Sequence, residues 1–494
     1  MCSDKTIPTK PLRFNSIDEW HHTTDVAVVG YGGAGSCAAI EAADAGKKVM
    51  MFELAAGPGG STALSSAEIY MGGDGGTRVQ AAVGHEDSNA AMIDYLTRCA
   101  GPQADLAKIE AYVKGSVGHF DWLVARGVPF KDSEYEQRAI MALTDDCLLF
   151  TGSEKAWPFH KTAKPCPRGH NLEVEGDNGG PLFMKIMRAN VDERDIDVQL
   201  NARVLTLILD DTGEVKGLRV RIDMQERDVR VNNGVILCAG GFVMNQPMVK
   251  KYAPSLLKCS VPIGNVGDMG TGILMGMGAG GAAINMHEGF VSVPYYPPAS
   301  LTYGLFINAQ GQRFINEDCY HGRVGAYVLQ QTGDRVYLVL SVDDYGAYET
   351  ESYLGASVAG TGESIEELEE ELGLPRGQLV QTLSTYNKNA SEGEDPLFHK
   401  SVEWLKELKA PYVALDVTPG RGAFLPYFTL GGLDTLPSGE VLSAEGNVIP
   451  GLYAAGRTAC GVPRRGAGYN SGISVGDATF TGRMAGIAAA NREL

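Results

Sequence analysis

Residues 26–53 carry the pattern that most constrains the fold of this chain. The apolar run 26–29 leads into Gly-x-Gly-x-x-Gly, and a second apolar run, 49–52, ends in Glu53. The motif glycines are Gly30, Gly32 and Gly35. This order predicts a strand, a tight turn, a helix packed closely on that strand, and a second strand whose acidic end accepts hydrogen bonds from a ribose. Because the first N–H groups of such a helix bind phosphate, the segment predicts a dinucleotide site.

The same spacing recurs at Gly276, Gly278 and Gly281, where we expect no nucleotide. No β-like run precedes these glycines, and residues 270–275 predict a helix that enters a turn. The chain therefore has one credible dinucleotide motif.

Length, charge and cysteine usage limit the class of protein. A chain of 494 residues predicts two or more folding units. Its formal net charge of −18, from 42 basic and 60 acidic residues, argues against nucleic acid and anionic lipid as partners. No apolar run approaches the ~20 residues that span a bilayer, and residues 1–5 lack the apolar run of a signal peptide. Nine scattered cysteines without Cys-x-x-Cys predict reduced thiols in a cytoplasmic protein.

Between the motif and the C-terminus, helical and extended patterns alternate. We expect a polar arm at 1–24, two helices within 86–127, an irregular stretch at 130–180, strands at 198–200 and 203–209, a hairpin turn at 210–213, a buried strand at 234–241, β-like alternation at 285–345 and a helical stretch at 363–394. The acidic run 364–372 predicts a solvated helix face. His160 and His170 lack metal-ligand spacing, so no metal is expected.

Two further glycine-rich segments are suited to a bound cofactor. Residues 59–66 form a glycine- and hydroxyl-rich loop, which either wraps a cofactor or faces solvent. Near the C-terminus, the buried strand 451–455 ends at Gly456, and the loop 466–472 leads into a helix that we expect to begin near Ser474. The positive end of that helix can stabilise negative charge on a reduced cofactor.

In this order and at these distances, the glycine blocks resemble those of the flavoproteins of the fumarate reductase and 3-ketosteroid dehydrogenase superfamily, over nearly the whole chain. The resemblance implies an α/β fold in which a Rossmann-like FAD-binding domain, 1–282 and 425–494, is interrupted by a smaller α+β cap domain, 283–424. The active site would lie between them. The implied cofactor is FAD, with no second domain for NAD(P)H. The loop after Glu53 lacks the His that tethers flavin in succinate dehydrogenases, so we expect noncovalent FAD.

Under this resemblance, the candidate FAD-binding residues lie in the glycine blocks and at the ends of nearby strands. They are Gly30, Gly32, Gly33, Ala34, Gly35, Glu53, Gly60, Ser61, Thr62, Ser65, Ser66, Val204, Ala239, Gly240, Gly456, Arg457, Gly472, Ile473 and Ser474.

The sequence departs from the dicarboxylate branch of that superfamily. Where fumarate reductases carry His-Thr, this chain has Phe428 and Thr429, and their carboxylate-binding Arg matches Tyr469. These changes favour an apolar ketone over a dianion, because a buried carboxylate needs a cation. Arg464 and Arg465 lie in the same loop, and we expect them to face phosphate or solvent.

The steroid branch fits better. The loop 469–483 is similar to the last loop of the 3-ketosteroid Δ4-(5α)-dehydrogenases, and Tyr320 is similar to their second catalytic tyrosine. The resemblance implies removal of a proton from steroid C4 and of a hydride from C5, with flavin N5 as hydride acceptor. We assign Tyr469 and Ser471 to proton transfer and Tyr320 to polarising the ketone or completing the proton path, with an exchange of the two tyrosine roles left open.

Three other functions stay open on sequence alone. They are a 3-ketosteroid Δ1-dehydrogenase, a flavin ene reductase acting on an unsaturated ketone or acid, and a flavin redox carrier without an organic substrate. We expect a small apolar ketone, a 3-ketosteroid, as substrate and an unidentified electron acceptor, with no nucleic acid and no membrane span.

Overall fold

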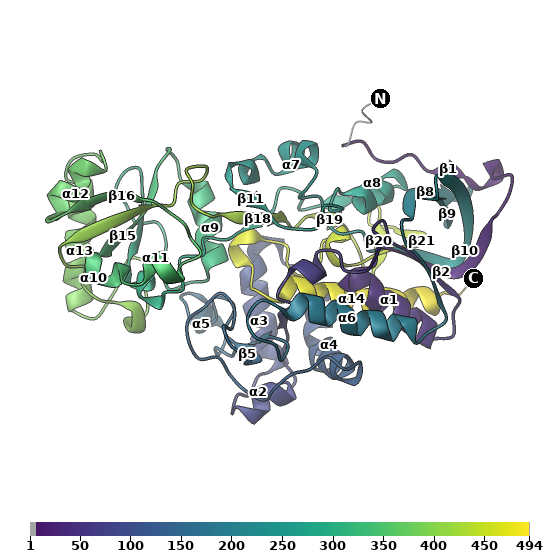
Figure 1. The fold of residues 1–494 in the computed structure, drawn as a ribbon, viewed down its shortest axis with the longest axis horizontal. Helices are drawn as coiled ribbons and strands as arrows, with labels where there is room; N and C mark the ends of the chain where they lie inside the picture. The colour runs from purple at the N-terminus through teal and green to yellow at the C-terminus, as the bar shows by residue number, and fades with distance from the viewer. Residues whose placement is uncertain (1–5, 494) are drawn as a thin grey trace.

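A nine-stranded sheet organises the larger lobe of the computed structural model, which describes residues 6–493 (Figure 1). The sheet runs β1-β8-β9-β10-β2-β3-β7, and β21 pairs with both β10 and β20. Its strands are β1 (Leu12–Arg13), β2 (His22–Val29), β3 (Val49–Phe52), β7 (Ile196–Gln199), β8 (Arg203–Leu209), β9 (Val215–Ile222), β10 (Gln225–Leu237), β20 (Glu440–Leu442) and β21 (Val448–Ala454).

The centre of this sheet is parallel and buried on both faces. Strands β21, β10, β2, β3 and β7 pair in parallel. Val26 and Val28 belong to one core cluster, whereas Ala27 and Val29 belong to another, as the period of two along a strand requires. The first cluster includes residues of α1 (Gly33–Asp44), α6 (Gly179–Asp192) and α14 (Ile473–Ala490). The predicted strand–helix–strand unit is therefore confirmed.

The N-terminal arm contributes to the sheet. Leu12 and Arg13 pair with Ile208 and Leu209 of β8, and β2 begins already at His22. The expectation of a polar arm over 1–24 was therefore wrong for these parts, because backbone pairing with an edge strand does not require apolar side chains. Residues 1–5 of that arm lie outside the described chain. The predicted hairpin is confirmed, since β8 and β9 pair in antiparallel fashion around 210–213.

A helical layer lies beside the sheet. The two helices expected within 86–127 are confirmed, and their N-termini are capped by Ser88 and Asp105. The stretch 130–180 is irregular apart from three short elements. The elements of this layer are β4 (Ile69–Tyr70), α2 (Arg78–Ala82), α3 (Asn89–Ala100), α4 (Leu106–Ala125), β5 (Leu148–Leu149), α5 (Phe159–Thr162) and β6 (Gly169–His170).

The smaller lobe is built on a four-stranded antiparallel sheet with the order β14-β15-β17-β16. It lies at the opposite end of the molecule from the chain termini (Figure 1). Its elements are β14 (Leu305–Asn308), β15 (Val336–Ser341), α10 (Val342–Tyr345), α11 (Tyr348–Glu351), β16 (Val358–Gly362), α12 (Ile365–Glu371), α13 (Gln378–Ser391) and β17 (Tyr412–Asp416).

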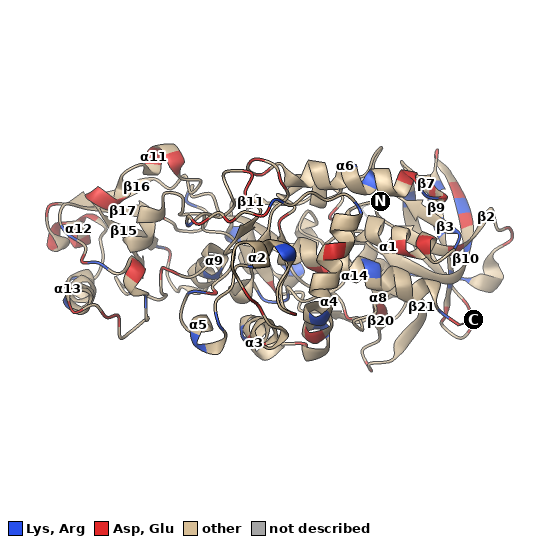
Figure 2. Cartoon of the chain, turned by 90° about the horizontal axis from the view of Figure 1, so that it is seen from below, with Lys and Arg blue, Asp and Glu red and all other residues tan. Residues whose placement is uncertain are grey.

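The acidic run on α12 is a solvated helix face with one exception. Figure 2 shows acidic residues, coloured red, on this helix at the far end of the smaller lobe. Glu366, Glu367, Glu370 and Glu371 are exposed. Glu369 is buried, because its carboxylate accepts hydrogen bonds from the backbone N–H groups of Gly377, Leu379 and Val380 at the start of α13.

Short elements connect the two lobes. They are α7 (Gln246–Tyr252), β11 (Val261–Pro262), α8 (Thr271–Gly278), β12 (Ala283–Ile284), β13 (Gly289–Val291), α9 (His321–Gln330), β18 (Pro426–Thr429) and β19 (Gly432–Leu433). The helix α8 confirms the helical reading of residues 270–275. The expected β alternation over 285–345 was wrong at α9 and at α10. Val324 and Val328 are buried on one side of α9, and Gly325 packs so closely on Val291 that an added Cβ would lie 2.1 Å from its carbonyl oxygen.

Candidate active site

The turn from β2 to α1 has the geometry of a phosphate-binding turn. Gly30 has φ +109°, and an added Cβ would lie 2.4 Å from the carbonyl oxygen of Cys238. At Gly35, an added Cβ would lie 1.9 Å from the oxygen of Gly30, so the helix packs directly on the turn. Around Gly32 the nearest atom lies 3.7 Å from an added Cβ, and Gly32, the N-cap residue of α1, has no side chain to cap the helix. A ligand can therefore approach the backbone closely at Gly32.

The loop after β3 is tied to this turn and to two distant segments. Thr62 Oγ1 accepts a hydrogen bond from Gly33 N at 3.1 Å. Ser61 Oγ donates to Asp268 Oδ2 at 2.5 Å, and the same carboxylate binds Arg457 at 3.0 Å. The loop 59–66 is thus held against the glycine turn rather than left free in solvent. Asp268 carried no sequence signal of its own.

Glu53 stands at the end of β3 beside the same turn. Its carboxylate accepts hydrogen bonds from Tyr31 N and Ala55 N, both at 2.8 Å. These contacts fix the side chain next to the glycine turn, where the motif requires an acceptor for a ribose.

The helices α1 and α14 lie side by side (Figure 1), in contact through glycines. Added Cβ atoms at Gly482 and Gly486 would lie 2.3 Å and 2.4 Å from the carbonyl oxygens of Ala34 and Ala38. These alanines are the second and sixth residues of α1, and the glycines are the tenth and fourteenth of α14. The helices therefore run in the same direction with an offset of eight residues, about 12 Å at 1.5 Å per residue.

The offset places two positive helix ends along one line. The α14 N-terminus lies about 12 Å beyond that of α1, on the side of the smaller lobe. Gly472 is the residue just before α14, with φ +86° and no side chain that caps the helix. The N-terminus of α1 suits a pyrophosphate, and the N-terminus of α14 suits an electron-accepting ring. The residues present therefore fit FAD. The helix begins at Ile473, one residue before the expected start.

Tyr320 and Tyr469 lie close together and are buried. Their ring centroids are 6.5 Å apart. The Tyr320 hydroxyl lies 2.9 Å from Ser471 Oγ, whereas the Tyr469 hydroxyl donates to Ser474 Oγ at 2.8 Å. Ser471, which the sequence analysis assigned to proton transfer with Tyr469, therefore contacts the Tyr320 hydroxyl instead. The chain turns at Gly472 in a left-handed conformation, which brings Ser474, in the first turn of α14, beside Tyr469.

The rings of Phe290 and Phe428 form an aromatic wall beside the two tyrosines. The centroid of Phe290 lies 4.5 Å from that of Tyr469 and 4.8 Å from that of Phe428. Burial raises the pKa of the Tyr469 hydroxyl to about 12 and that of Tyr320 well above its usual value. Both phenols are therefore protonated at neutral pH and act first as hydrogen-bond donors. Phe290 was not identified from the sequence, because a single phenylalanine in a β-like segment has no distinctive pattern.

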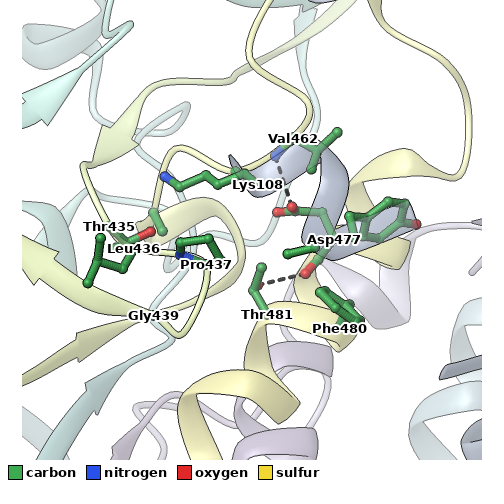
Figure 3. Close-up of a pocket in the computed structure, with 13 residues that line it drawn as sticks. Lys108, Thr435, Leu436, Pro437, Gly439, Val462, Asp477, Phe480 and Thr481 are labelled. Carbon is green, nitrogen blue, oxygen red and sulfur yellow. Dashed lines mark hydrogen bonds between the residues drawn. The ribbon is translucent and has the colours of Figure 1, made fainter. Parts of the chain in front are cut away.

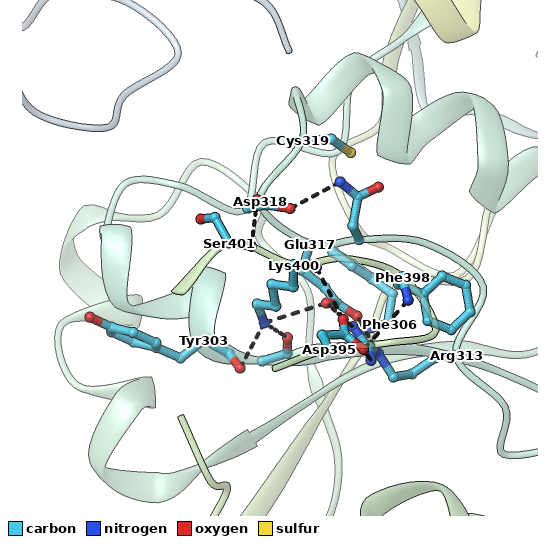
Figure 4. Close-up of polar contacts among 12 residues, drawn as sticks. Tyr303, Phe306, Arg313, Glu317, Asp318, Cys319, Asp395, Phe398, Lys400 and Ser401 are labelled. Carbon is cyan, nitrogen blue, oxygen red and sulfur yellow. Dashed lines mark hydrogen bonds and ion pairs between the residues drawn. The ribbon is translucent and has the colours of Figure 1, made fainter. Parts of the chain in front are cut away.

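A buried ionic network supports the segment that carries Tyr320 (Figure 4). The Arg313 guanidinium binds Glu317 at 2.8 Å and Asp395 at 3.0 Å, and Lys400 Nζ lies 3.4 Å from Glu317. Burial lowers the pKa of Lys400 to about 8. Because a buried charge without a partner is costly, this network fixes the backbone three residues before Tyr320.

The loop before α14 is held by a hydrogen bond to Asp477 of that helix (Figure 3). Asp477 accepts a hydrogen bond from Val462 N at 2.9 Å, beside a cavity of about 20 Å³. Arg464 is 6% exposed and binds Asp105 at 3.4 Å, Gly461 O at 3.0 Å and Gln103 O at 3.2 Å. The expectation that Arg464 faces phosphate or solvent was therefore wrong, because these acceptors neutralise it inside the protein.

Cysteines and metal ligands contribute no further site in residues 6–493. The eight cysteines of this range are buried and free, and Cys2 lies outside it. The same range contains no group of three His, Cys, Asp or Glu side chains that could hold a metal ion. None of its helices is both long and apolar enough to cross a bilayer.

The fold and the two helix ends define a flavin-dependent oxidoreductase, and comparison with known proteins agrees. The FAD binding domain family model matches residues 25–474. The chain belongs to this family of FAD-dependent oxidoreductases and binds FAD.

Three relatives are informative. The crystal structure of 3-ketosteroid-Δ4-(5α)-dehydrogenase from Rhodococcus jostii RHA1, in complex with 4-androstene-3,17-dione, superposes with a TM-score of 0.92 and 39% identity, over 98% of this chain and 100% of that one. A fumarate reductase (cytochrome) from Shewanella frigidimarina is 30% identical over 95% of this chain and 77% of its own. A 3-oxo-5-alpha-steroid 4-dehydrogenase from Comamonas testosteroni is 26% identical over 90% and 95%.

Proposed function

We propose that the protein desaturates 3-ketosteroids, introducing the Δ4 double bond into 5α-3-ketosteroids. One observation carries the proposal. Tyr320 and Ser471 form a hydrogen-bonded pair next to Tyr469, within an aromatic wall that lies at the N-terminus of α14. The similarity to the Rhodococcus steroid dehydrogenase supports the same substrate class.

The positions of the glycine turn and of the α14 N-terminus support the FAD-binding roles proposed from sequence. Gly30, Gly32 and Gly35 would admit the pyrophosphate, and Gly472 and Ser474 would face the flavin. Bound FAD supplies the acceptor for the hydride that leaves steroid C5. Residues 283–424 are proposed as the cap over the steroid, with the adjoining ranges forming the FAD-binding domain.

The structure favours exchanged roles for the two tyrosines. Because Ser471 binds Tyr320, this pair is proposed to take the C4 proton. Tyr469, a phenol that stays protonated at neutral pH, would donate to the C3 ketone oxygen as negative charge develops there. Polarising the ketone makes the C4 proton more acidic, which a weak base pair requires.

Two of the three cations near the aromatic wall are paired with carboxylates. Arg457 binds Asp268 and Arg464 binds Asp105, whereas Arg323 donates to the Ala467 carbonyl oxygen and the Tyr327 hydroxyl and keeps a buried Nε without an acceptor in the described structure. A dicarboxylate would need two free cations to offset the loss of hydration. A neutral ketone needs none, so the site favours the steroid over fumarate or succinate.

Substrate charge therefore provides the test of the proposed function. We expect a neutral 5α-3-ketosteroid to bleach the flavin absorbance in anaerobic mixing, with a Δ4-3-ketone as the product. Succinate should leave the oxidised spectrum unchanged, and fumarate should not reoxidise the reduced enzyme. Saturable reoxidation by fumarate would restore the reductase function, and a Δ1 product would establish the alternative regiochemistry.

The mode of FAD attachment is a separate prediction. The loop 54–68 contains no His, Cys or Tyr that could form a covalent link to the flavin ring. We expect acid precipitation to release all of the flavin into the supernatant, measured by its absorbance. Flavin that remains with the pellet would contradict noncovalent binding.

A further inference from the structure

Glu68 is a buried acid that the proposed mechanism does not use. It is 2% exposed, and its Oε1 has no hydrogen-bond partner in the described structure. An added Cβ at Gly169 would lie 3.0 Å from Oε1 and 2.7 Å from Thr151 Oγ1, so the missing side chain of this glycine leaves room for both groups. A buried carboxyl group with an unused oxygen is costly to keep, which points to a role other than packing.

The loop 151–154 joins Glu68 to the proposed proton-transfer pair. Thr151 Oγ1 donates to the Ser471 carbonyl oxygen at 3.0 Å, and Ser471 N donates back to Thr151 O at 2.9 Å. Ser153 Oγ accepts from Tyr320 N at 3.1 Å. The Thr151 hydroxyl also stabilises the ionised form of Glu68. One loop therefore contacts Tyr320, Ser471 and Glu68.

The charge of Glu68 acts on both tyrosines. A negative charge on Glu68 raises the pKa of both Tyr320 and Tyr469. Burial, together with the carboxylates of Glu154 and Asp177, raises the pKa of Glu68 to about 8. Glu68 thus changes its charge near neutral pH, unlike an exposed carboxylate.

We propose that Glu68 is the terminal acceptor for the substrate proton. This inference rests on the proposed function. The C–H bond at steroid C4 breaks, its proton passes to the Tyr320–Ser471 pair, and the pair gives up a proton to the nearby Glu68 carboxylate, which becomes a carboxylic acid. The electron pair of that bond forms the new double bond, and bound FAD would supply the acceptor of the C5 hydride. Glu68 then releases the proton to solvent before the next turnover.

The sign of the pH dependence follows from this role. The acceptor must be ionised, so flavin reduction by a 5α-3-ketosteroid should become faster as pH rises through about 8. Glu68→Gln keeps the shape but cannot accept a proton. We expect it to reduce the rate by about 10- to 100-fold at pH 9 and to remove the rise with pH. FAD content should be unchanged.

Glu154→Gln is the matched control. Glu154 is equally buried, but its two oxygens accept from the Tyr70 hydroxyl and Gly152 N, each at 2.9 Å. This variant should keep the rise in rate with pH. If Glu68→Gln does not fold, the pH dependence of the wild-type rate still decides the question.

A second measurement does not depend on turnover. Infrared titration of the substrate-free holoenzyme should show a protonated carboxyl band that is lost near pH 8 and is absent from Glu68→Gln. An identical band in that variant, or an unchanged rise of rate with pH, would overturn the role of Glu68. A wild-type flavin that no 3-ketosteroid reduces would refute the proposed function instead.

Discussion

Replacing Tyr320 with phenylalanine is expected to lower turnover by about 10²–10⁴-fold, the usual contribution of one acid–base group. The substitution removes the hydroxyl that lies 2.9 Å from Ser471 Oγ, and the ring stays packed against Phe290 and His321. The rate of flavin reduction in anaerobic stopped-flow mixing measures the loss. Spectral titration with the product steroid should show unchanged binding.

Two variants sharpen this result. Ser471→Ala should lose less than Tyr320→Phe, because water can replace a serine hydroxyl as a hydrogen-bond partner. Tyr353 is 44% exposed in the smaller lobe, so Tyr353→Phe should leave the rate unchanged. Near-normal turnover in Tyr320→Phe would remove this residue from proton transfer and return that role to Tyr469.

Gly482→Ala is expected to destabilise the protein and to lower its FAD content. A glycine-to-alanine change inside a helix normally stabilises by about 0.5–1 kcal/mol. At Gly482 the new Cβ would lie 2.3 Å from the backbone oxygen of Ala34, so α1 and α14 must separate, at a cost of about 1–3 kcal/mol or more. Their separation would displace both helix ends proposed to hold FAD. Thermal unfolding and flavin absorbance per protein measure the two effects.

Gly118→Ala provides the control for this experiment. Gly118 also lies inside a helix, α4, but nothing stands within 4 Å of its added Cβ. This variant should be slightly more stable than the wild type, with full FAD content. Equal effects of the two substitutions would contradict the close crossing of α1 and α14.

The cofactor-binding half of the protein could be predicted because its signals are local. Gly30, Gly35 and Glu53 act within one strand–turn–helix–strand unit, so their spacing already implies their neighbours. The loop 59–66 was ambiguous between a cofactor and solvent. It was resolved only by the contacts of Ser61 with Asp268 and of Thr62 with Gly33, which join segments far apart in sequence.

The helix α9 shows the limit of pattern analysis in another way. Its residues follow β-like segments, and the close packing of Gly325 on Val291 appears only in the tertiary structure. The acidic run on α12 was predicted as solvated, yet Glu369 was withdrawn from water by the backbone of α13. The conformation of α9 and the burial of Glu369 depend on which element packs against them. The residues adjacent in sequence do not reveal that element.

The sequence by itself determined the dinucleotide turn, the FAD-dependent class and the residue types of the active site, because each rests on spacing over a few residues. The tertiary structure alone decided which of these side chains meet. Tyr320 and Ser471 are 151 positions apart, yet their hydroxyls are in contact, whereas Tyr469 turns to Ser474. Glu68 lies beside Thr151, whose hydroxyl donates to the Ser471 carbonyl oxygen. Hydrogen-bond partners that are far apart in sequence are determined by how the lobes and loops pack. The local spacing of residues does not predict that packing.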